Sequence, residues 1–478
     1  MMRKQTAWAV FIFVCAAFGV LFLWPLGRVV AGGFVEEGRF TLKYLLGVFR
    51  NPIYAEGLVN SLLLAVGTTL LALLIAVPLA WLAGRYEFPC KGLLTGLLLV
   101  PMILPPFVGA IGFQKIFGQY GALNALLDLG PVDWLGRGRY FGVIILQALG
   151  LYPILYLNVV AALANVDPAM EEAAENMGCS GWRKFRRITL PLIMPGLFAG
   201  GTIIFVWSFT ELGTPLIMNY TRCASVQVYD ALKEVASNPF PYALVFVMLF
   251  CSVMLYAGTR LTFGRHAYAM QGKAMIGATA RRARGPAALL IPLPFIVVIL
   301  VALLPHAGVV LTSFTPPGSW YRSALPAAYT LGNYVDALGH SMTVSSIRNS
   351  LLFSSLAVVL NLTLGVAIAF VVVRSTIRLR GVLDALAMVP LAVPGLVMAF
   401  GYLAISSTLS NMTWVKDSTL WSALFDIRVN PTLFLVIAYA VRRLPYMVRA
   451  SVAGLQQTSV SLEESAANLG APPFTTLR

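Results

Sequence analysis

The stretch NSLLLAVGTTLLALLIAVPLAWLAGR at residues 60–85 returns later in the chain as NSLLFSSLAVVLNLTLGVAIAFVVVR at residues 349–374. Both copies open with asparagine and serine, end with arginine, and carry no charge in between. A bilayer core about 30 Å thick needs about 20 consecutive apolar residues in a helix. Each copy is therefore predicted to cross a membrane, and the chain is predicted to contain an internal repeat.

The repeat continues in register beyond this first pair of stretches. VPMILPPFVGAIGF at residues 100–113 aligns without a gap with VPLAVPGLVMAFGY at residues 389–402. The positions that coincide include Val100 with Val389, Pro101 with Pro390, Pro105 with Pro394, and Gly112 with Gly401. Farther on, residues 171–178 align with residues 463–470. An even number of predicted spans separates equivalent positions. The two halves are therefore expected to be parallel, related by an axis along the membrane normal.

The composition is that of a polytopic membrane protein. Of the 478 residues, 59% are hydrophobic and 11% are charged, whereas a soluble domain carries about 25% charged residues. The net charge of +15 comes with basic residues gathered in the short loops of one predicted side, which is the pattern of cytoplasmic loops. We therefore expect contact with membrane lipids and no nucleic-acid partner.

The predicted spans define the domain organisation. The first repeat covers residues 1–265 with six transmembrane helices, residues 266–285 form a basic cytoplasmic linker, and the second repeat covers residues 286–478 with four visible helices. The N-terminal apolar run is longer than the core of a usual signal peptide, so we expect a retained helix with a cytoplasmic N-terminus. The second repeat ends within its own polar segment, and we expect it to be truncated. The spans are expected at about 7–29, 58–83, 92–113, 140–164, 190–218, 242–261, 286–311, 350–373, 382–404 and 431–455.

A polar segment interrupts this apolar chain and occurs in both repeats. The first polar segment (residues 167–191) contains EEAAENMGCSGWRKFRRITLP from Glu171 onward, and the second polar segment (residues 459–470) repeats its opening. An aspartate followed by proline marks a helix start, and Glu171 and Glu172 favour the positive end of that helix. Gly178 permits a turn into a second, amphipathic piece. The segment is predicted to form a small helix–turn–helix on the cytoplasmic face.

Such a protruding helix–turn–helix suits insertion into a groove on a soluble partner. The alternative is a solvated loop that only joins two spans. A passive loop does not need the same spacing of glutamate, alanine, asparagine and glycine in both repeats, so the duplication favours a docking element.

The residues of the first polar segment resemble a known family. The pattern E-A-A-x3-G-x9-I-x-L-P, formed by Glu172, Ala173, Ala174, Gly178, Ile188, Leu190 and Pro191, is similar to the cytoplasmic signature of the permease subunits of binding-protein-dependent ABC importers. The second copy has Ser465 where the first has Ala173, and it ends before the Ile-x-Leu-Pro portion. The resemblance implies an all-α type I ABC importer transmembrane fold in a bacterial inner membrane.

The resemblance also implies a division of labour. A periplasmic substrate-binding protein would deliver the substrate, and two copies of a separate ABC ATPase would bind and hydrolyse ATP. The chain has no G-x4-G-K-[ST] motif of its own, and no cofactor is expected on it. The residues that the resemblance assigns to ATPase docking are Glu171, Glu172, Ala173, Ala174, Gly178, Glu463, Glu464, Ala466 and Gly470.

Charged residues at membrane depth are candidates for the substrate pathway. Arg442 and Arg443 lie in the last predicted span beside Pro445, and Glu211 lies in the fifth predicted span. The alternatives are that the arginines pair with an acid or extend to the interface, and that Glu211 is a structural partner. R-x-L-P-Y-x-x-R, beginning at Arg442, resembles the fused, duplicated permeases for ferric iron, 2-aminoethylphosphonate and thiamine. Ferric iron is therefore the first expectation, with a phosphonate or thiamine as alternatives.

Other functional classes are less well supported. A secondary transporter with two six-helix halves would have the same repeat, but the loops GRYEFPCKG and RSTIRLRG match its expected charged loops weakly. A channel is a third class, which the proline-interrupted spans disfavour slightly. No catalytic spacing is evident, and the scattered histidines and cysteines predict no metal site.

Overall fold

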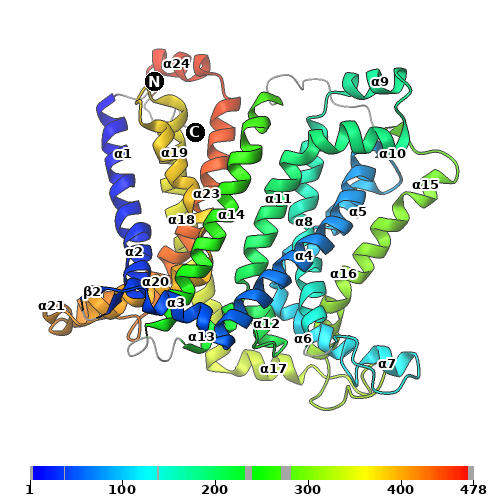
Figure 1. Ribbon diagram of the computed structural model, residues 1–478, viewed down its shortest axis with the longest axis horizontal. Helices are drawn as coiled ribbons and strands as arrows, with labels where there is room; N and C mark the ends of the chain where they lie inside the picture. The colour runs from blue at the N-terminus through cyan, green and yellow to red at the C-terminus, as the bar shows by residue number, and fades with distance from the viewer. Residues whose placement is uncertain (1–3, 37, 137–138, 232–238, 271–280, 472–478) are drawn as a thin grey trace. The chain divides into compact units, whose positions relative to one another are not determined.

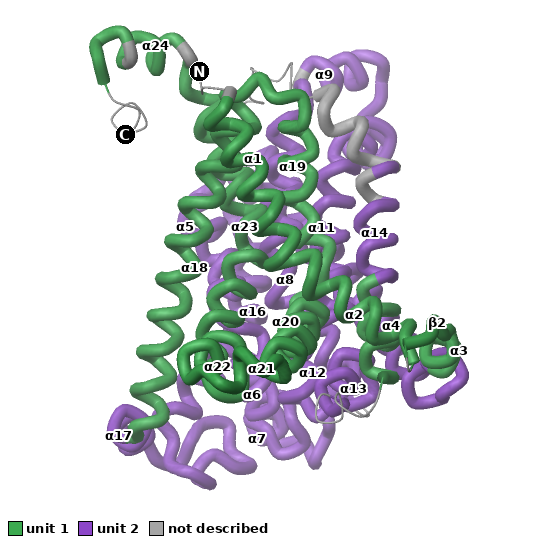
Figure 2. The backbone as a smooth tube through the Cα atoms, turned by 90° about the vertical axis from the view of Figure 1, so that its left-hand side faces the viewer, with its two compact units in different colours: residues 1–47, 235–249, 340–478 green, residues 48–234, 250–339 purple. Residues whose placement is uncertain are grey.

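The computed structural model describes residues 4–36, 38–136, 139–231, 239–270 and 281–471 and is almost entirely helical. The chain divides into two compact units, which Figure 2 distinguishes by colour. Unit 1 comprises residues 1–47, 235–249 and 340–478, and unit 2 comprises residues 48–234 and 250–339. Both units contain helices from both sequence repeats. The two predicted repeats, which are consecutive stretches of sequence, are therefore not the same as these two units, which are defined by contacts between residues.

The spanning helices agree with the predicted ones. Seven helices of the described chain are long and apolar enough to cross a membrane, and two bent pairs raise the number to nine if each pair is one span. The single helices cover Gln5–Phe34, Pro52–Arg85, Tyr140–Ala164, Gly181–Thr210, Phe240–Gly258, Ala287–Ser313 and Ser341–Arg374. Helix α23 (Thr432–Gln457) is also long but contains three arginines. The protein is a multi-pass membrane protein.

Unit 2 is built around α4 (Pro52–Arg85), α8 (Tyr140–Ala164) and α11 (Leu190–Thr210), which Figure 1 shows running together. One face of α4 presents mostly small residues to its neighbours, because Ala72, Ala76, Ala80 and Ala83 are buried there beside Leu79. Small side chains let membrane helices approach closely. Larger buried side chains of α8, among them Tyr152 and Leu155, fill the space opposite.

Two predicted spans are broken rather than continuous. The first consists of α5 (Lys91–Leu97) and the 3-10 turn η2 (Val100–Met102), followed after a bend of 96° by α6 (Pro106–Phe117). The second consists of α19 (Arg380–Met388) and η6 (Val389–Leu391), followed after 98° by α20 (Gly395–Ser410). Pro105 and Pro394 stand at the N-caps of α6 and α20. Proline has no backbone N–H, so it favours a helix start over a continuous helix here.

Each bent pair packs against the first helix of the other repeat. In unit 2, α16 (Pro292–Ser313) crosses α6 so closely that a Cβ atom on Gly112 would lie 2.0 Å from the Pro305 carbonyl oxygen. In unit 1, α2 (Trp24–Phe34) crosses α20, and a Cβ on Gly401 would lie 2.9 Å from Pro25. The equivalent glycines of the two repeats therefore serve the same close contact.

The other elements of unit 1 complete its helical bundle. Helix α1 (Lys4–Phe18) continues through the π-turn η1 (Gly19–Leu23) into α2, and the Tyr402 hydroxyl of α20 donates to the Leu21 carbonyl at 2.8 Å. Helix α18 (Ser341–Arg374) packs on α23, where a Cβ on Gly365 would lie 2.6 Å from Met447. Helix α14 (Phe240–Met270) belongs to both units, its first residues to unit 1.

Short elements connect these helices. The strand β4 (Arg281–Arg282), which ends the predicted linker, pairs in parallel with β3 (Tyr86–Glu87) at the end of α4. Residues 271–280 of the linker lie outside the described residues. At the other end of unit 2 lie α7 (Ala122–Leu126), α12 (Gly213–Ile217), α13 (Ala224–Ala231) and α17 (Gly332–Gly339). Unit 1 has the hairpin β1–β2 (Val35–Glu36, Arg39–Phe40) with α3 (Lys43–Arg50), and α21 (Thr413–Lys416) with α22 (Thr419–Phe425).

Candidate functional site

The first polar segment forms the predicted helix–turn–helix. Helix α9 (Pro168–Asn176) starts where the Asp167 carboxylate accepts a hydrogen bond from the Ala169 N–H at 2.9 Å. It ends at Gly178, whose φ of +77° lies in the left-handed region that favours glycine. The chain then enters α10 (Gly181–Lys184) and the π-turn η4 (Phe185–Thr189), which lead into α11. Figure 1 shows α9 and α10 at one end of unit 2.

The second polar segment has the same form. Helix α24 (Val460–Asn468) follows α23 and ends at Gly470, whose φ is +81°. The two glycines that the repeat aligns thus end the two helices in the same backbone conformation. Residues 472–478, which follow, lie outside the described residues.

A buried ion pair anchors α9 to the spanning helices. The guanidinium of Arg85, in the last turn of α4, donates to the carboxylate of Glu171, which is 4% exposed. The same oxygen accepts a hydrogen bond from the Thr189 hydroxyl at 2.7 Å. Glu171 therefore points toward its own unit, and its predicted contact with a partner would be indirect.

The second repeat contains the same ion pair. Arg374, in the last turn of α18, donates from Nε to Glu463 Oε1 at 2.8 Å. Its Nη2 also donates to the carbonyls of Leu455 and Thr458, both at 2.9 Å. Arg85 and Arg374 are the arginines that end the two repeated stretches. Sequence reasoning took them only as loop charges, although their equivalence and that of Glu171 and Glu463 were visible.

The remaining predicted docking residues divide by exposure. Ala174 is buried at 2% exposure, and Ala466 is half-buried. The exposed ones are Glu172, Ala173, Gly178, Glu464 and Gly470. The structure places the residues of each segment on one short helix or in the turn that follows it, and their docking role stays a prediction.

The sequence analysis did not identify four exposed apolar side chains in the two polar segments. Met170 and Met177 of the first polar segment are 50% and 81% exposed, and Leu462 and Leu469 of the second are 64% and 89% exposed. The members of each pair are seven residues apart. Met170 lies in α9 and Leu462 in α24, and Met177 and Leu469 directly follow these helices. The pairs also occupy equivalent repeat positions. We call these four residues the docking face, after the predicted docking role of the two polar segments.

A second ion-pair chain ties α9 to its surroundings. Lys184 Nζ lies 2.5 Å from Glu175 Oε1, and Arg281 Nη2 lies 3.8 Å from Glu175 Oε2. The hydrogen bond from Lys184 holds the pKa of the Glu175 carboxyl below its usual value. Residues from α9, α10 and the linker strand are thereby held together.

The predicted pathway arginines lie beside the bend of the second broken span. Arg442 covers the start of α20, where a Cβ on Gly395 would lie 2.3 Å from its Nη1. In the first repeat the position equivalent to Arg442 is Gly150 of α8, and the position equivalent to Gly395 is Pro106. The small residue of this contact therefore lies on the other helix, where Gly150 faces Pro106. The second repeat thus places a positive charge beside its bend at the position where the first repeat has a glycine. Arg443 is exposed, and its guanidinium carbon lies 5.9 Å from the centroid of the Tyr446 ring.

Glu211 has a structural environment. Its carboxylate accepts hydrogen bonds from the backbone N–H groups of Gly213 at 3.1 Å and Thr214 at 3.4 Å. It thereby caps the first turn of α12. These contacts favour the alternative of a structural partner, and a role in the pathway stays a prediction.

A buried polar cluster of unit 2 was not predicted. Gln147 of α8 is 1% exposed, and its Oε1 accepts hydrogen bonds from Thr68 of α4 at 3.2 Å and Ser208 of α11 at 2.5 Å. Its Nε2 has no hydrogen-bond partner within the described chain. Buried polar side chains in spanning helices are functional candidates, but a lone glutamine in an apolar run gives little sequence signal.

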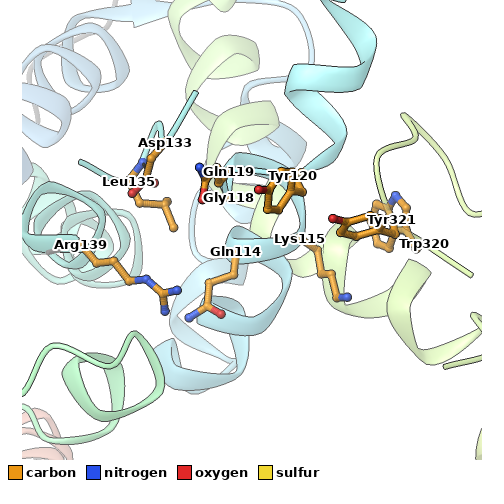
Figure 3. A pocket seen from close by; sticks show the side chains of 11 residues that line it. Gln114, Lys115, Gly118, Gln119, Tyr120, Asp133, Leu135, Arg139, Trp320 and Tyr321 are labelled. Carbon is orange, nitrogen blue, oxygen red and sulfur yellow. Dashed lines mark hydrogen bonds between the residues drawn. The ribbon is translucent and has the colours of Figure 1, made fainter. Parts of the chain in front are cut away.

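The end of unit 2 remote from α9 contains a pocket of about 290 Å³ (Figure 3). Lys115, Arg139 and Gln114 contribute polar groups, and Tyr120 and Tyr321 contribute aromatic rings whose centroids are 5.5 Å apart. Arg139 donates to the Met218 carbonyl at 3.1 Å. The pocket therefore combines cationic and aromatic groups.

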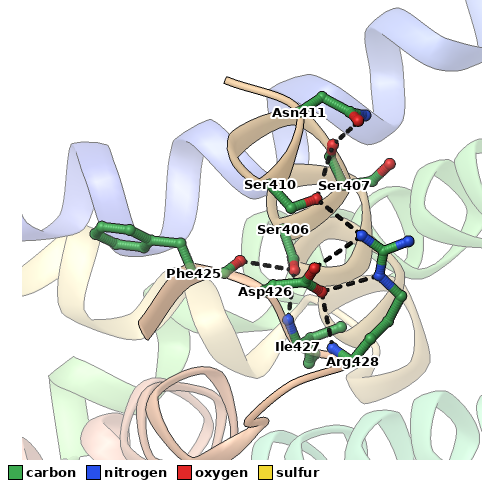
Figure 4. A network of polar contacts seen from close by, with 8 residues as sticks. All are labelled: Ser406, Ser407, Ser410, Asn411, Phe425, Asp426, Ile427 and Arg428. Carbon is green, nitrogen blue, oxygen red and sulfur yellow. Dashed lines mark hydrogen bonds and ion pairs between the residues drawn. The ribbon is translucent and has the colours of Figure 1, made fainter. Parts of the chain in front are cut away.

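Unit 1 has a polar network after α20 (Figure 4). The Asp426 carboxylate accepts hydrogen bonds from the Arg428 guanidinium at 2.8 and 2.9 Å, and these hold the pKa of Asp426 below its usual value. Ser406 donates to the Phe425 carbonyl and accepts from the Ile427 N–H, both at 2.9 Å. The network fixes the loop between α22 and α23.

Comparison with known proteins gives the family. The model of the family described as "Binding-protein-dependent transport system inner membrane component" matches residues 76–265, which include the first polar segment. The molybdenum transport system permease protein ModB of Haemophilus influenzae is 34% identical over 159 residues, which are 33% of this chain and 68% of that protein. The chain belongs to this family. The predicted membership of the importer permeases is confirmed, and so is the predicted type I importer fold.

Two relatives match along nearly the whole chain. The ferric transport system permease protein FbpB of Actinobacillus pleuropneumoniae is 25% identical over 446 residues, which are 91% of this chain and 60% of that protein. The putative ferric transport system permease protein FbpB 1 of H. influenzae is 26% identical over 91% of this chain and 66% of that protein. The chain thus spans roughly three fifths to two thirds of their length. Both of its repeats take part in the likeness to these permeases.

Proposed function

We propose that this family member is the transmembrane subunit of an ATP-driven importer and that its substrate is ferric iron. A binding protein would deliver the substrate from the periplasm, and two copies of a separate ATPase would supply the energy. The observation that carries the proposal is the duplication of the docking face on two anchored helices. One docking helix per ATPase copy explains why the same surface occurs in both repeats.

The contacts support a mechanism for transmitting movement. Each docking helix is joined by a buried arginine–glutamate pair to the end of a long spanning helix, α4 or α18. When ATP closes the ATPase dimer, the docking helices would move with it and carry those ends along. The pathway would then alternate between two states that the nucleotide populates differently. The N-terminus would lie on the same cytoplasmic side as both docking helices.

The choice of ferric iron rests on the extent of the similarity. The ferric permeases match over 91% of the chain, whereas the molybdenum permease is more similar but matches over 33%. Molybdate is therefore the second candidate, because the positive charge of Arg442 beside the bend suits an oxyanion. A phosphonate or thiamine remains a further alternative on the arginine motif alone.

Reconstitution tests the proposal. The protein, its ATPase and its binding protein are placed in proteoliposomes, and uptake of radioactive ferric iron and of molybdate is measured with and without ATP. Iron accumulation that requires both ATP and the binding protein supports the proposal. Molybdate uptake in place of iron contradicts ferric iron as the substrate. Uptake driven by an ion gradient without ATP contradicts the ATP-driven mechanism.

A further inference from the structure

A groove of about 1000 Å³ runs along the outside of α4 toward α9 and α10 in unit 2. It lies beside the Arg85–Glu171 pair but extends well beyond it. A volume of this size is at the upper end for small-molecule sites. The groove differs in chemistry between its two ends, and this difference indicates its ligand.

The long wall of the groove is apolar. Leu70, Leu74, Val77 and Trp81 line it at helical spacing, and Leu70 and Leu74 are 60% and 72% exposed. The rise from residue 70 to residue 81 is about 16 Å in an α-helix. This is close to half of the roughly 30 Å hydrocarbon core. The wall therefore has the length of one leaflet of acyl chain.

The end of the groove near α9 is aromatic. Trp81 and Tyr86 are in edge contact with ring centroids 6.0 Å apart, and Trp182 stacks on Phe185 at 5.3 Å. All four side chains line the groove, and Trp182 is 72% exposed. Tryptophan and tyrosine concentrate at the level of the lipid headgroups. The aromatic residues thus mark the membrane surface above the apolar wall.

Beyond the aromatic residues the lining carries both signs of charge. Lys184 and Arg281 supply cationic groups, and the Arg281 side chain is 80% exposed. Glu175 already binds both of them. Glu172 also lines the groove, is exposed, and makes no ion pair within the described chain. A phosphate beside Arg281 and an ammonium beside Glu172 would each lie next to a side chain of opposite charge.

We propose that this groove binds one phospholipid whose headgroup carries a phosphate and a primary ammonium, as in phosphatidylethanolamine. The acyl chain lies along the α4 wall, the phosphate contacts Arg281 and Lys184, and the ammonium contacts Glu172. A lipid with a net negative headgroup, such as phosphatidylglycerol, is disfavoured because Glu172 and Glu175 face the same space. The proposal requires only that α4 spans a membrane and is independent of the transported substrate.

Native mass spectrometry of the full chain released from nanodiscs tests the proposal. With equal amounts of phosphatidylethanolamine and phosphatidylglycerol, we expect one retained phosphatidylethanolamine. Val77→Trp fills the middle of the groove and should abolish retention. Val66→Trp, on the same face of α4 but outside the groove, should not. Equal retention by these two variants contradicts the proposal.

Headgroup variants supply the second test. Arg281→Gln should weaken phosphatidylethanolamine retention about fivefold, the usual effect of one basic residue near a membrane surface. The matched control Arg282→Gln changes a neighbouring exposed arginine that does not line the groove and should have no effect. Glu172→Gln should remove the preference over phosphatidylglycerol. Wild-type protein that retains both lipids equally overturns the proposal, whatever the transport activity of the complex.

Discussion

At the scale of single residues, the arginine–glutamate pairs join α9 and α24 to the ends of the long helices α4 and α18. Both Arg85 and Glu171 are largely removed from solvent, with side chains 24% and 5% exposed. A buried ion pair adds little net stability, but removal of one partner leaves an uncompensated charge. The pair therefore acts as a positional constraint on α9 rather than as a source of stability.

Arg85→Ala should detach α9 from α4. The unpaired Glu171 carboxylate would cost about 3–5 kcal/mol, so the helix should move or unfold locally. Faster amide exchange over residues 168–176 and weaker ATPase binding are the expected results. Lys91→Ala, which breaks an exposed pair with Glu87, should change stability by less than about 1 kcal/mol. Unchanged exchange in Arg85→Ala would contradict the anchoring role.

Sequence reasoning identified the residues of the polar segments but not their directions. The helix start, the turn at Gly178 and the duplication were predictable, because capping and backbone preferences are local. The inward direction of Glu171 depends on Arg85, which is distant in the chain and has the composition of an ordinary loop charge. The docking face needed the burial of each side chain, which periodicity over one short helix does not provide.

At the scale of elements, two predicted spans are broken in the structure, and hydropathy alone did not predict the breaks. Hydropathy measures how many apolar residues follow one another, and it contains no information on a bend of 96° or 98°. The prolines marked where the breaks occur. The packing of each repeat's first helix against the bent pair of the other repeat was also not predicted, because it depends on contacts between distant parts of the chain. The structure shows that Gly112 and Gly401 permit these close contacts.

Gly112→Ala should destabilise the crossing of α6 and α16. The added methyl group would lie 2.0 Å from the Pro305 carbonyl oxygen, and overpacking of this kind costs about 1–3 kcal/mol. Gly109→Ala, one turn away, would meet nothing closer than 3.4 Å and should be nearly neutral. Thermal unfolding in detergent measures the difference. Equal melting temperatures for the two variants would refute the close contact.

The loop after α22 should have a defined response to acid. Hydrogen bonds from Arg428 lower the pKa of Asp426 from its reference value of 3.8. A lowered pKa stabilises the folded loop above the unfolded value, and that stability is lost as pH falls through the folded value. Fluorescence of Trp414 and Trp421 should stay constant down to about pH 4 and change below it. In Asp426→Asn this low-pH change should be absent; an identical acid transition would exclude Asp426 as its cause.

At the scale of the whole molecule, the chain is a duplicated permease in which each repeat carries a short anchored helix, α9 or α24, that we propose as a docking helix. Sequence alone gave the family, the parallel repeat and the membrane class, because these follow from long-range periodicity and a spaced motif. The substrate did not follow, since it depends on a pathway formed by side chains from several helices. Arg442 beside the bend is the residue that most clearly distinguishes the second repeat from the first.

The most direct measurement of the central claim is ATPase binding by a variant of the docking face. In Met177→Glu/Leu469→Glu, each docking helix carries a charge where an apolar side chain would enter the partner. Loss of such an anchor typically costs more than about 1 kcal/mol, so affinity should fall at least about fivefold per site. Leu126→Glu changes a leucine that is 69% exposed in α7 at the other end of unit 2, and this variant should bind the ATPase normally. Undiminished ATPase binding by the double variant would contradict the account.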